Sequence, residues 1–266
     1  MTFFGTTDFL LEVAKGNITG HKIMKGLGER NNIGTTATGE DLWLGNDLSA
    51  VPSAPGSTTS IPFPSSAGEQ MSIICENAKD TSGGSGVQSV TVHYLDDTGA
   101  EQSTLVITNG TTAVNLTPTN VRFVQEIAAL TVGSTGVAEG NIRIYKTSDA
   151  RLVYSMIAAG GNQSLVPHRM VPLGKTLHIV SWTGSEVRAK RVFLRLSADC
   201  NDLVIPPVKQ TGVFLFKETI GVNASTSPYV PVWRSVPALS VVKVSAFAVS
   251  AGGEASCSWA GVLVDD

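Results

Sequence analysis

The histidines of this chain are the side chains best suited to metal binding or acid–base catalysis, but their spacing forms no site. The four are His21, His93, His168 and His178, and no pair follows the H-x-H or H-x-x-x-H pattern of ligands that share a strand or helix face. A Ser-His-Asp triad lacks its signature too, because no G-x-S-x-G sequence stands at a strand-to-helix turn. The sequence therefore predicts neither a metal site nor a hydrolase triad.

Acidic pairs and a glycine-rich loop are the other features with catalytic potential. The adjacent carboxylates lie in predicted turns or at the chain end: Glu40-Asp41, Asp96-Asp97 and Asp265-Asp266. Glycosidases instead need two carboxyl groups that face each other at a defined separation. The loop from Ser82 to Gly86 precedes a predicted strand, whereas a phosphate cradle needs a helix N-terminus after its loop. We therefore expect no cofactor and no enzymatic activity.

The three cysteines, Cys75, Cys200 and Cys257, are widely separated and form no C-x-x-C pair, which argues against a zinc site or a redox motif. Each stands in or beside an apolar run, where a free cysteine behaves as a small hydrophobe. We expect buried thiols. One disulfide, within the chain or between subunits, is the alternative.

One dense group of basic residues, Arg188, Lys190, Arg191 and Arg195, is a candidate for polyanion binding. On a strand, Arg191 and Arg195 share one face while Arg188 and Lys190 share the other, so they form no continuous stripe. We expect a solvated edge or ion pairs with acidic neighbours. The net charge of −3 and the pI near 5.8 also predict no nucleic-acid partner, because phosphate binding needs a positive field.

The elements that must position these residues are predicted to be β-strands. The chain has 266 residues, a hydrophobic fraction of 42% and only 15% charged residues, which is typical of hydroxyl-rich β proteins. At about 150 residues per domain, this length allows one large or two ordinary β domains. Period-two alternation between turn sequences predicts strands at 70–75, 88–95, 101–108, 121–130 and 141–146, then at 152–158, 165–171, 176–182, 192–198, 213–219, 229–233, 240–249 and 255–264.

This pattern predicts an all-β fold of antiparallel sandwich or jelly-roll modules, with strand order left open. We expect a first module at 65–150 and a second at 151–266. In the first, Val90, Val92 and Tyr94 should face one way, and Thr91 and His93 the other.

An N-terminal arm at 1–45 and a Pro/Ser-rich linker at 46–64 are expected to precede the modules. Residues 8–15 predict one short helix, capped by Asp8 and ended by Gly16, that must dock on its own body or on a neighbour. The glycines that follow, Gly20, Gly26, Gly28 and Gly34, should prevent regular structure. The apolar run Leu42-Trp43-Leu44 should be either packed or an interface anchor. No signal peptide or membrane-spanning stretch is recognised, so we expect no membrane partner.

Several distinctive motifs are spread over nearly the whole chain. They are F-L-L-E-V-A-K-G-N-I-T-G-H at 9–21, N-N-I-G-T and E-D-L-W after it, V-x-V-x-Y-L-D at 90–96, A-A-G-G-N-Q-S-L at 158–165, V-P-L-G-K-T at 171–176 and the terminal V-L-V-D-D. Together these motifs resemble a family of tailed-bacteriophage virion structural proteins. The resemblance implies a component of the virion, assembled in the host bacterial cytoplasm. It supplies no catalytic residue.

Our leading hypothesis is a capsid-bound decoration or cement protein. Its partner would be the major capsid protein or another virion protein, and its body would form a homo-oligomer, with a trimer favoured. Deletion of 1–45 should then leave a folded body that no longer binds capsids. The expected arm anchors are Phe9, Leu10, Val13, Leu42, Trp43 and Leu44, and the expected points of arm flexibility are Gly16, Gly20, Gly26 and Gly28.

Two alternatives stay open. One is a neck, tail or fibre-attachment component of the virion. The other is a carbohydrate- or receptor-binding module that uses exposed tryptophans, for which Trp182, Trp233 and Trp259 are available, although strand positions favour core packing.

Overall fold

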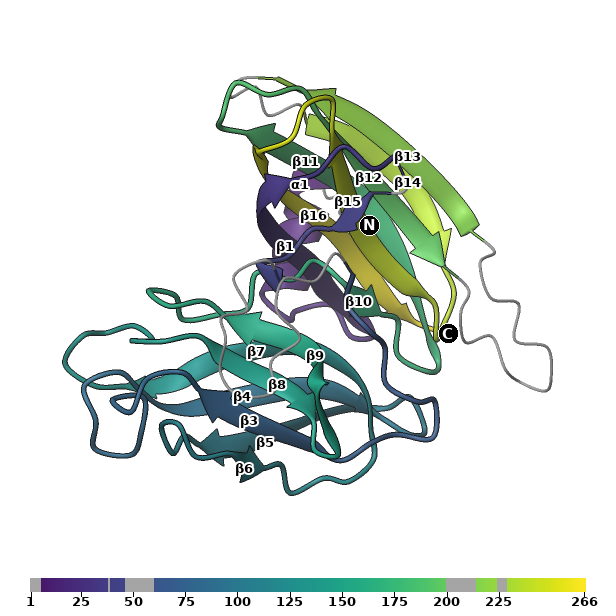
Figure 1. Ribbon diagram of the computed structural model, residues 1–266. Coiled ribbons are helices and arrows are strands. Elements are labelled where there is room, and N and C mark those ends of the chain that lie inside the picture. The colour runs from purple at the N-terminus through teal and green to yellow at the C-terminus, as the bar shows by residue number, and fades with distance from the viewer. Residues whose placement is uncertain (1–5, 38, 46–59, 200–213, 224–228) are drawn as a thin grey trace.

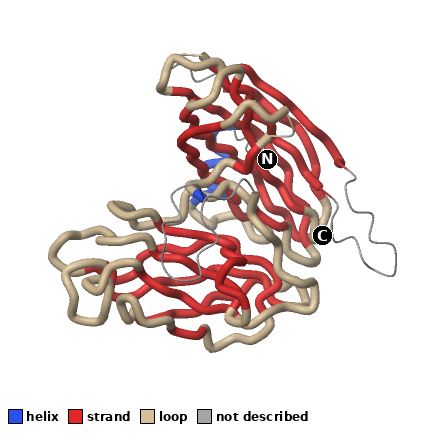
Figure 2. The backbone as a smooth tube through the Cα atoms, in the orientation of Figure 1, coloured by secondary structure: helices blue, strands red, loops and turns tan. Residues whose placement is uncertain are grey.

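The chain folds into two antiparallel β-sandwiches and one short helix (Figure 1; Figure 2). The computed structural model of the protein describes residues 6–37, 39–45, 60–199, 214–223 and 229–266. In Figure 1 the middle of the chain forms the lower sandwich, and segments from both ends form the upper one. The predicted all-β, antiparallel class with one helix near the N-terminus is confirmed.

The first module has two sheets, with strand orders β6-β3-β8-β9 and β5-β4-β7. Its strands are β3 (Met71–Cys75), β4 (Val87–Asp96), β5 (Glu101–Ile107), β6 (Val114–Asn115), β7 (Val121–Val132), β8 (Ile142–Lys146) and β9 (Asp149–Ile157). In β4, Val90, Val92 and Tyr94 are buried in the core between the sheets, while Thr91 is half-buried and His93 is exposed. The predicted alternation of this strand is therefore confirmed.

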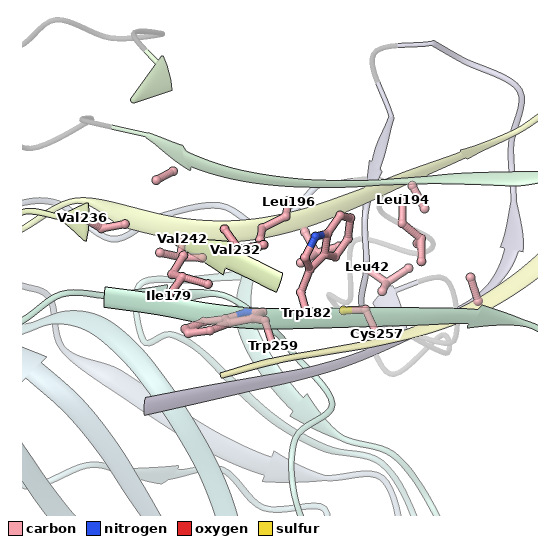
Figure 3. Close-up of a cluster of buried hydrophobic side chains, with 14 of the residues drawn as sticks. Leu42, Ile179, Trp182, Leu194, Leu196, Val232, Val236, Val242, Cys257 and Trp259 are labelled. Carbon is pink, nitrogen blue, oxygen red and sulfur yellow. The ribbon is translucent and has the colours of Figure 1, made fainter. Parts of the chain in front are cut away.

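The second module also has two sheets, with orders β1-β16-β11-β14 and β10-β15-β12-β13, and β2 pairs with β15. Its strands are β1 (His21–Ile33), β2 (Glu40–Asp41), β10 (Arg169–Met170), β11 (Lys175–Glu186), β12 (Val192–Asp199), β13 (Phe214–Val222), β14 (Tyr229–Val236), β15 (Val241–Ala248) and β16 (Gly253–Asp265). Figure 3 shows its core, in which Trp182 and Trp259 are each 1% exposed.

The strand that we expected to open the second module belongs to the first. β9 pairs with β8, from Lys146 opposite Asp149 to Ile142 opposite Ile157. The sequence between them is a tight turn rather than a break between domains, so the chain reverses and continues the same sheet. The expected boundary at 150–151 therefore falls inside β9.

Residues 21–33 form a strand where we expected none. β1 pairs with β16 from His21 opposite Val264 to Ile33 opposite Gly253, with one irregularity after Arg30. Gly26 and Gly28 are paired with β16 like their neighbours and do not interrupt this strand. Both stand at positions where the packing leaves no room for a side chain. A Cβ at Gly26 would lie 2.2 Å from Nε1 of Trp259 and 2.4 Å from the carbonyl oxygen of Pro167. These glycines allow close packing of a strand rather than bending of an arm.

Replacing Gly26 by alanine should therefore lower the free energy of unfolding by about 1–3 kcal/mol. The indole of Trp259 that the new Cβ meets is held by its own hydrogen bond to the Pro167 carbonyl, 2.8 Å long, so it has little room to move. Urea denaturation measures the change. Gly221→Ala on β13 is the matched control, because a Cβ there makes only an ordinary 3.4 Å contact with Phe193. Equal stability of the two variants would contradict the close packing.

The helix α1 (Thr6–Ala14) begins before Asp8, so Asp8 lies inside the helix and is not its N-cap. Gly16 follows the helix with φ +76°, which agrees with the predicted end at this glycine. The helix packs on β1, and the rings of Phe9 and His21 meet edge to face with centroids 5.8 Å apart. Among the described residues, no helix is long and apolar enough to cross a membrane.

Candidate functional site

The helical part of the predicted arm docks on the chain's own body. Val13 is 2% exposed, and Phe9 and Leu10 are half-buried. Leu11, which we had not selected, is 50% exposed. Of the two partners that the sequence allowed for this helix, the structure shows the chain's own β body.

The run Leu42-Trp43-Leu44 is packed rather than exposed. Leu42 lies in the core of the second module, and Trp43 lies in a cluster with Tyr145, Val153 and other residues of the first module. Leu42 and Trp43 are both fully buried and Leu44 is half-buried. The structure therefore gives Leu42 and Trp43 a place in this chain's interior, and neither side chain is available to a neighbouring molecule.

A buried ion pair explains why this segment stays on the body. Nε of Arg30 on β1 donates to Oε2 of Glu40 at 2.7 Å, and their side chains are only 2% and 12% exposed. The same guanidinium donates to the carbonyl of Trp43 at 3.3 Å, and the Asp41 carboxylate accepts the Ile61 amide at 2.9 Å. We had placed Glu40-Asp41 in a solvated turn, which is wrong, because the partners that bury these carboxylates are distant in sequence.

His168 is a buried titratable group at the junction of the two modules. It is 1% exposed, its Nε2 lies 3.4 Å from the Val244 carbonyl oxygen, and its ring centroid is 6.3 Å from that of Phe63. Burial lowers its pKa to about 4, although the nearby carboxylate of Asp41 opposes the shift. His168 is therefore neutral at physiological pH and acts as a packing residue.

A cleft with a volume of about 510 Å³ lies between the two modules. One wall comes from β1, and the other from β4, β5 and β7. Its charged and titratable lining residues are Lys22, Lys25, His93, Glu101, Glu126 and Arg169. The sequence analysis did not anticipate this cleft, because its two walls come from segments that are far apart in the chain.

Most of the charges in the cleft are engaged with one another across the module boundary. Nζ of Lys22 lies 2.9 Å from Oε1 of Glu101, and Arg169 lies 3.5 Å from Glu126. Arg169 also donates to the carbonyls of Val166 and His168, at 2.8 and 2.7 Å. Burial lowers the pKa of Arg169 to about 10, which leaves it charged at neutral pH. Two ion pairs therefore cross the boundary between the modules.

The cleft also contains a histidine and a serine, His93 and Ser103, which face each other across β4 and β5. The structure describes no hydrogen bond between this imidazole and this hydroxyl. A nucleophile and its base must be within hydrogen-bond reach. His93 and Ser103 therefore form no such pair in this structure.

The remaining candidate residues serve the fold. Trp182 and Trp259 are core residues, and the Trp233 side chain lies outside the description. Cys75 and Cys257 are free and buried, and burial raises the pKa of Cys75 to about 12; Cys200 lies outside the described residues. No group of three metal-binding side chains occurs among the residues that the structure describes.

The basic group on the second module is divided among different contacts, but not by strand alternation, because Arg188, Lys190 and Arg191 lie in the turn between β11 and β12. Arg188 pairs with Glu254 at 2.7 Å. Arg191 and Arg195 lie over the rings of Phe193 and Phe247, 5.1 and 5.3 Å from their centroids. In these cation–π contacts the two guanidinium groups interact with aromatic rings of the same chain.

No protein-family model and no curated protein matches this sequence. Two solved structures of infectious bursal disease virus are similar to it. The Gt strain structure is 8% identical over 97% of this chain and 78% of that chain, with a TM-score of 0.23. The Gx strain structure is 13% identical over 92% and 72%, with a TM-score of 0.22. Both are virus structures and neither is from a tailed bacteriophage. TM-scores of this size do not show a shared fold, so membership of a phage family stays a prediction.

Proposed function

We propose that this chain is a non-enzymatic structural protein of a virus particle. The observation that supports this most directly is how firmly the two modules are joined. Gln125 of β7 and Met170 of β10 exchange two hydrogen bonds, of 2.6 and 3.1 Å. Apolar clusters around Trp43 and around Phe123 fill the junction. A rigid body of this kind suits a role in assembly, where a fixed shape positions several contacts at once.

The chemistry of the described residues supports the same proposal. Among the described residues, the ion pair of Arg30 and Glu40, the buried tryptophans and the buried thiols are packed inside the fold. In this proposal the protein has no cofactor, no nucleic-acid partner and no membrane partner. Its partners are further copies of itself and other proteins of the particle.

The narrower form of the proposal is a decoration or cement protein on the head of a tailed bacteriophage, bound to the major capsid protein as a trimer. It rests on the sequence motifs. Leu42 and Trp43 leave the set of expected anchors, because both side chains are buried within this chain. Among the expected anchors, the half-buried Phe9 and Leu10 of α1 stay candidates, and the exposed Leu11 joins them.

Copy number per purified particle, measured by quantitative mass spectrometry against the major capsid protein, tests both forms. Roughly one copy per capsid subunit is expected for a decoration protein. A ring of about six or about twelve copies would instead favour a neck or tail component. If the protein is absent from purified particles, the structural role is wrong, and the carbohydrate- or receptor-binding module becomes the leading hypothesis.

A further inference from the structure

One edge of the sheet β5-β4-β7 is hydrogen-bonded to another segment of the chain, and the other edge has no described strand beside it. The edge at β7 is covered, because the Ala129 amide donates to the Asn162 carbonyl at 2.7 Å and the Ser164 amide donates to the Ile127 carbonyl at 2.9 Å. Figure 1 shows β5 at the other edge of this sheet. No described strand pairs with that edge.

β5 also lacks the features that keep exposed strand edges from pairing. Natural edges carry lysine, arginine or proline, contain bulges, or are very short. Among the other described edges, β1 has Lys22 and Lys25, β14 has Pro231, β13 has Lys217, and β6 and β10 have two residues each. β5 has seven residues, pairs with β4 without irregularity and contains one charged residue, Glu101, at its start.

Toward its C-terminal end, β5 exposes two large apolar side chains. Leu105 is 54% exposed and Ile107 is 58% exposed, and they stand beside Thr91 and Ser89 of β4. On the other side of β4, β7 contributes Leu130, which is 60% exposed and stands at an irregularity in the pairing of β4 with β7. Large apolar side chains gathered beside an open strand edge mark an interaction surface.

We propose that β5 is an association edge, to which a second copy of this chain adds its own β5 in antiparallel orientation. The two sheets would then continue as one across a two-fold axis. With the axis at Thr104, Glu101 of one copy would face Ile107 of the other.

Charge is what selects a second copy over another partner. Glu101 is already neutralised by Lys22 of its own chain, 2.9 Å away, so the edge presents no net charge and gives no advantage to a charged segment. Antiparallel pairing also places the two Glu101 residues at opposite ends of the contact, whereas parallel pairing would place like charges side by side. The β5 edge of one copy is therefore complementary in charge to the β5 edge of a second copy in antiparallel orientation.

The molecular mass of the purified protein, measured by light scattering over a concentration series, tests the proposal. We expect a dimer of twice the 27.8 kDa chain mass, or a hexamer if trimers form elsewhere on the body. Ile107→Glu should weaken the dimer contact at least about tenfold, because it places a second carboxylate opposite Glu101 of the other copy. Val249→Glu is the control, because Val249 is 61% exposed on the second module.

A cysteine at the proposed axis tests the register. In antiparallel pairs, directly opposed Cα atoms are about 4.5–5.5 Å apart, within disulfide range. Thr104→Cys should therefore give a covalent dimer under mild oxidation, whereas Thr219→Cys on the edge strand β13 should not. A monomer at all concentrations, or an oligomer that Ile107→Glu leaves intact and Thr104→Cys fails to cross-link, would overturn the β5 contact. The copy-number measurement of the proposed function would be unaffected by that result.

Discussion

Deletion of residues 1–45 should leave the second module unfolded. This segment contains β1, which forms one whole edge of the sheet β1-β16-β11-β14, and Leu42, which lies in the core of that module. It also contains Trp43, and removing a buried tryptophan side chain alone costs about 3–5 kcal/mol. The loss of Leu42 adds about 2–5 kcal/mol and the loss of the whole strand β1 adds more, so the cost is comparable with the total stability of about 5–15 kcal/mol that a typical domain has. We therefore expect the opposite of what the arm hypothesis predicts, which is a body that stays folded after this deletion.

Near-ultraviolet circular dichroism and thermal unfolding of the truncated protein measure this effect. Deletion of residues 1–16 is the matched control, since it removes α1 and leaves β1, Arg30 and Trp43 in place. We expect that shorter deletion to retain a cooperative transition and the near-ultraviolet signal of buried tryptophans. A native-like signal after deletion of 1–45 would show that β1 is an arm after all, and that its pairing with β16 is dispensable.

Acidification should destabilise the protein through His168, by about 3 kcal/mol between neutral pH and pH 4. Burial lowers the pKa of His168 from 6.5 to about 4, with Lys243 and Arg169 adding to the shift and Asp41 opposing it. Between these two pKa values the unfolded chain binds a proton that the folded chain does not, so stability falls as the pH falls. Each pKa unit is worth about 1.4 kcal/mol.

Urea denaturation at a series of pH values from neutral to acidic measures this slope, and the His168→Gln variant isolates it. The variant should be less stable than the natural protein at neutral pH, because it alters a buried contact. Its stability should nevertheless fall less on acidification, since carboxylates such as Glu69 titrate in both proteins while the imidazole is gone. Parallel pH profiles for the two proteins would assign the acid sensitivity to groups other than His168.

The local sequence patterns were sufficient to predict the all-β fold class and most strands of the first module. In β4, alternation placed Val90 and Val92 in the core and His93 outside. This works because a strand with one buried face imposes a period of two on its own residues, whichever strands lie beside it. The absence of histidine ligand spacing was likewise readable without the fold, since it depends on neighbours in the chain.

The role of residues 21–45 depended on contacts that no local pattern records. Gly26 and Gly28 resemble breakers, and only the approach of Trp259 and Pro167 shows that they fit a packed strand. Arg30 and Glu40 resemble surface charges until their burial together is seen. The open edge at β5 and the cleft beside β1 also arise from pairing between segments far apart in sequence. Backbone pairing and close packing are set by partners from elsewhere in the chain, and this is why they emerge only when the chain is folded.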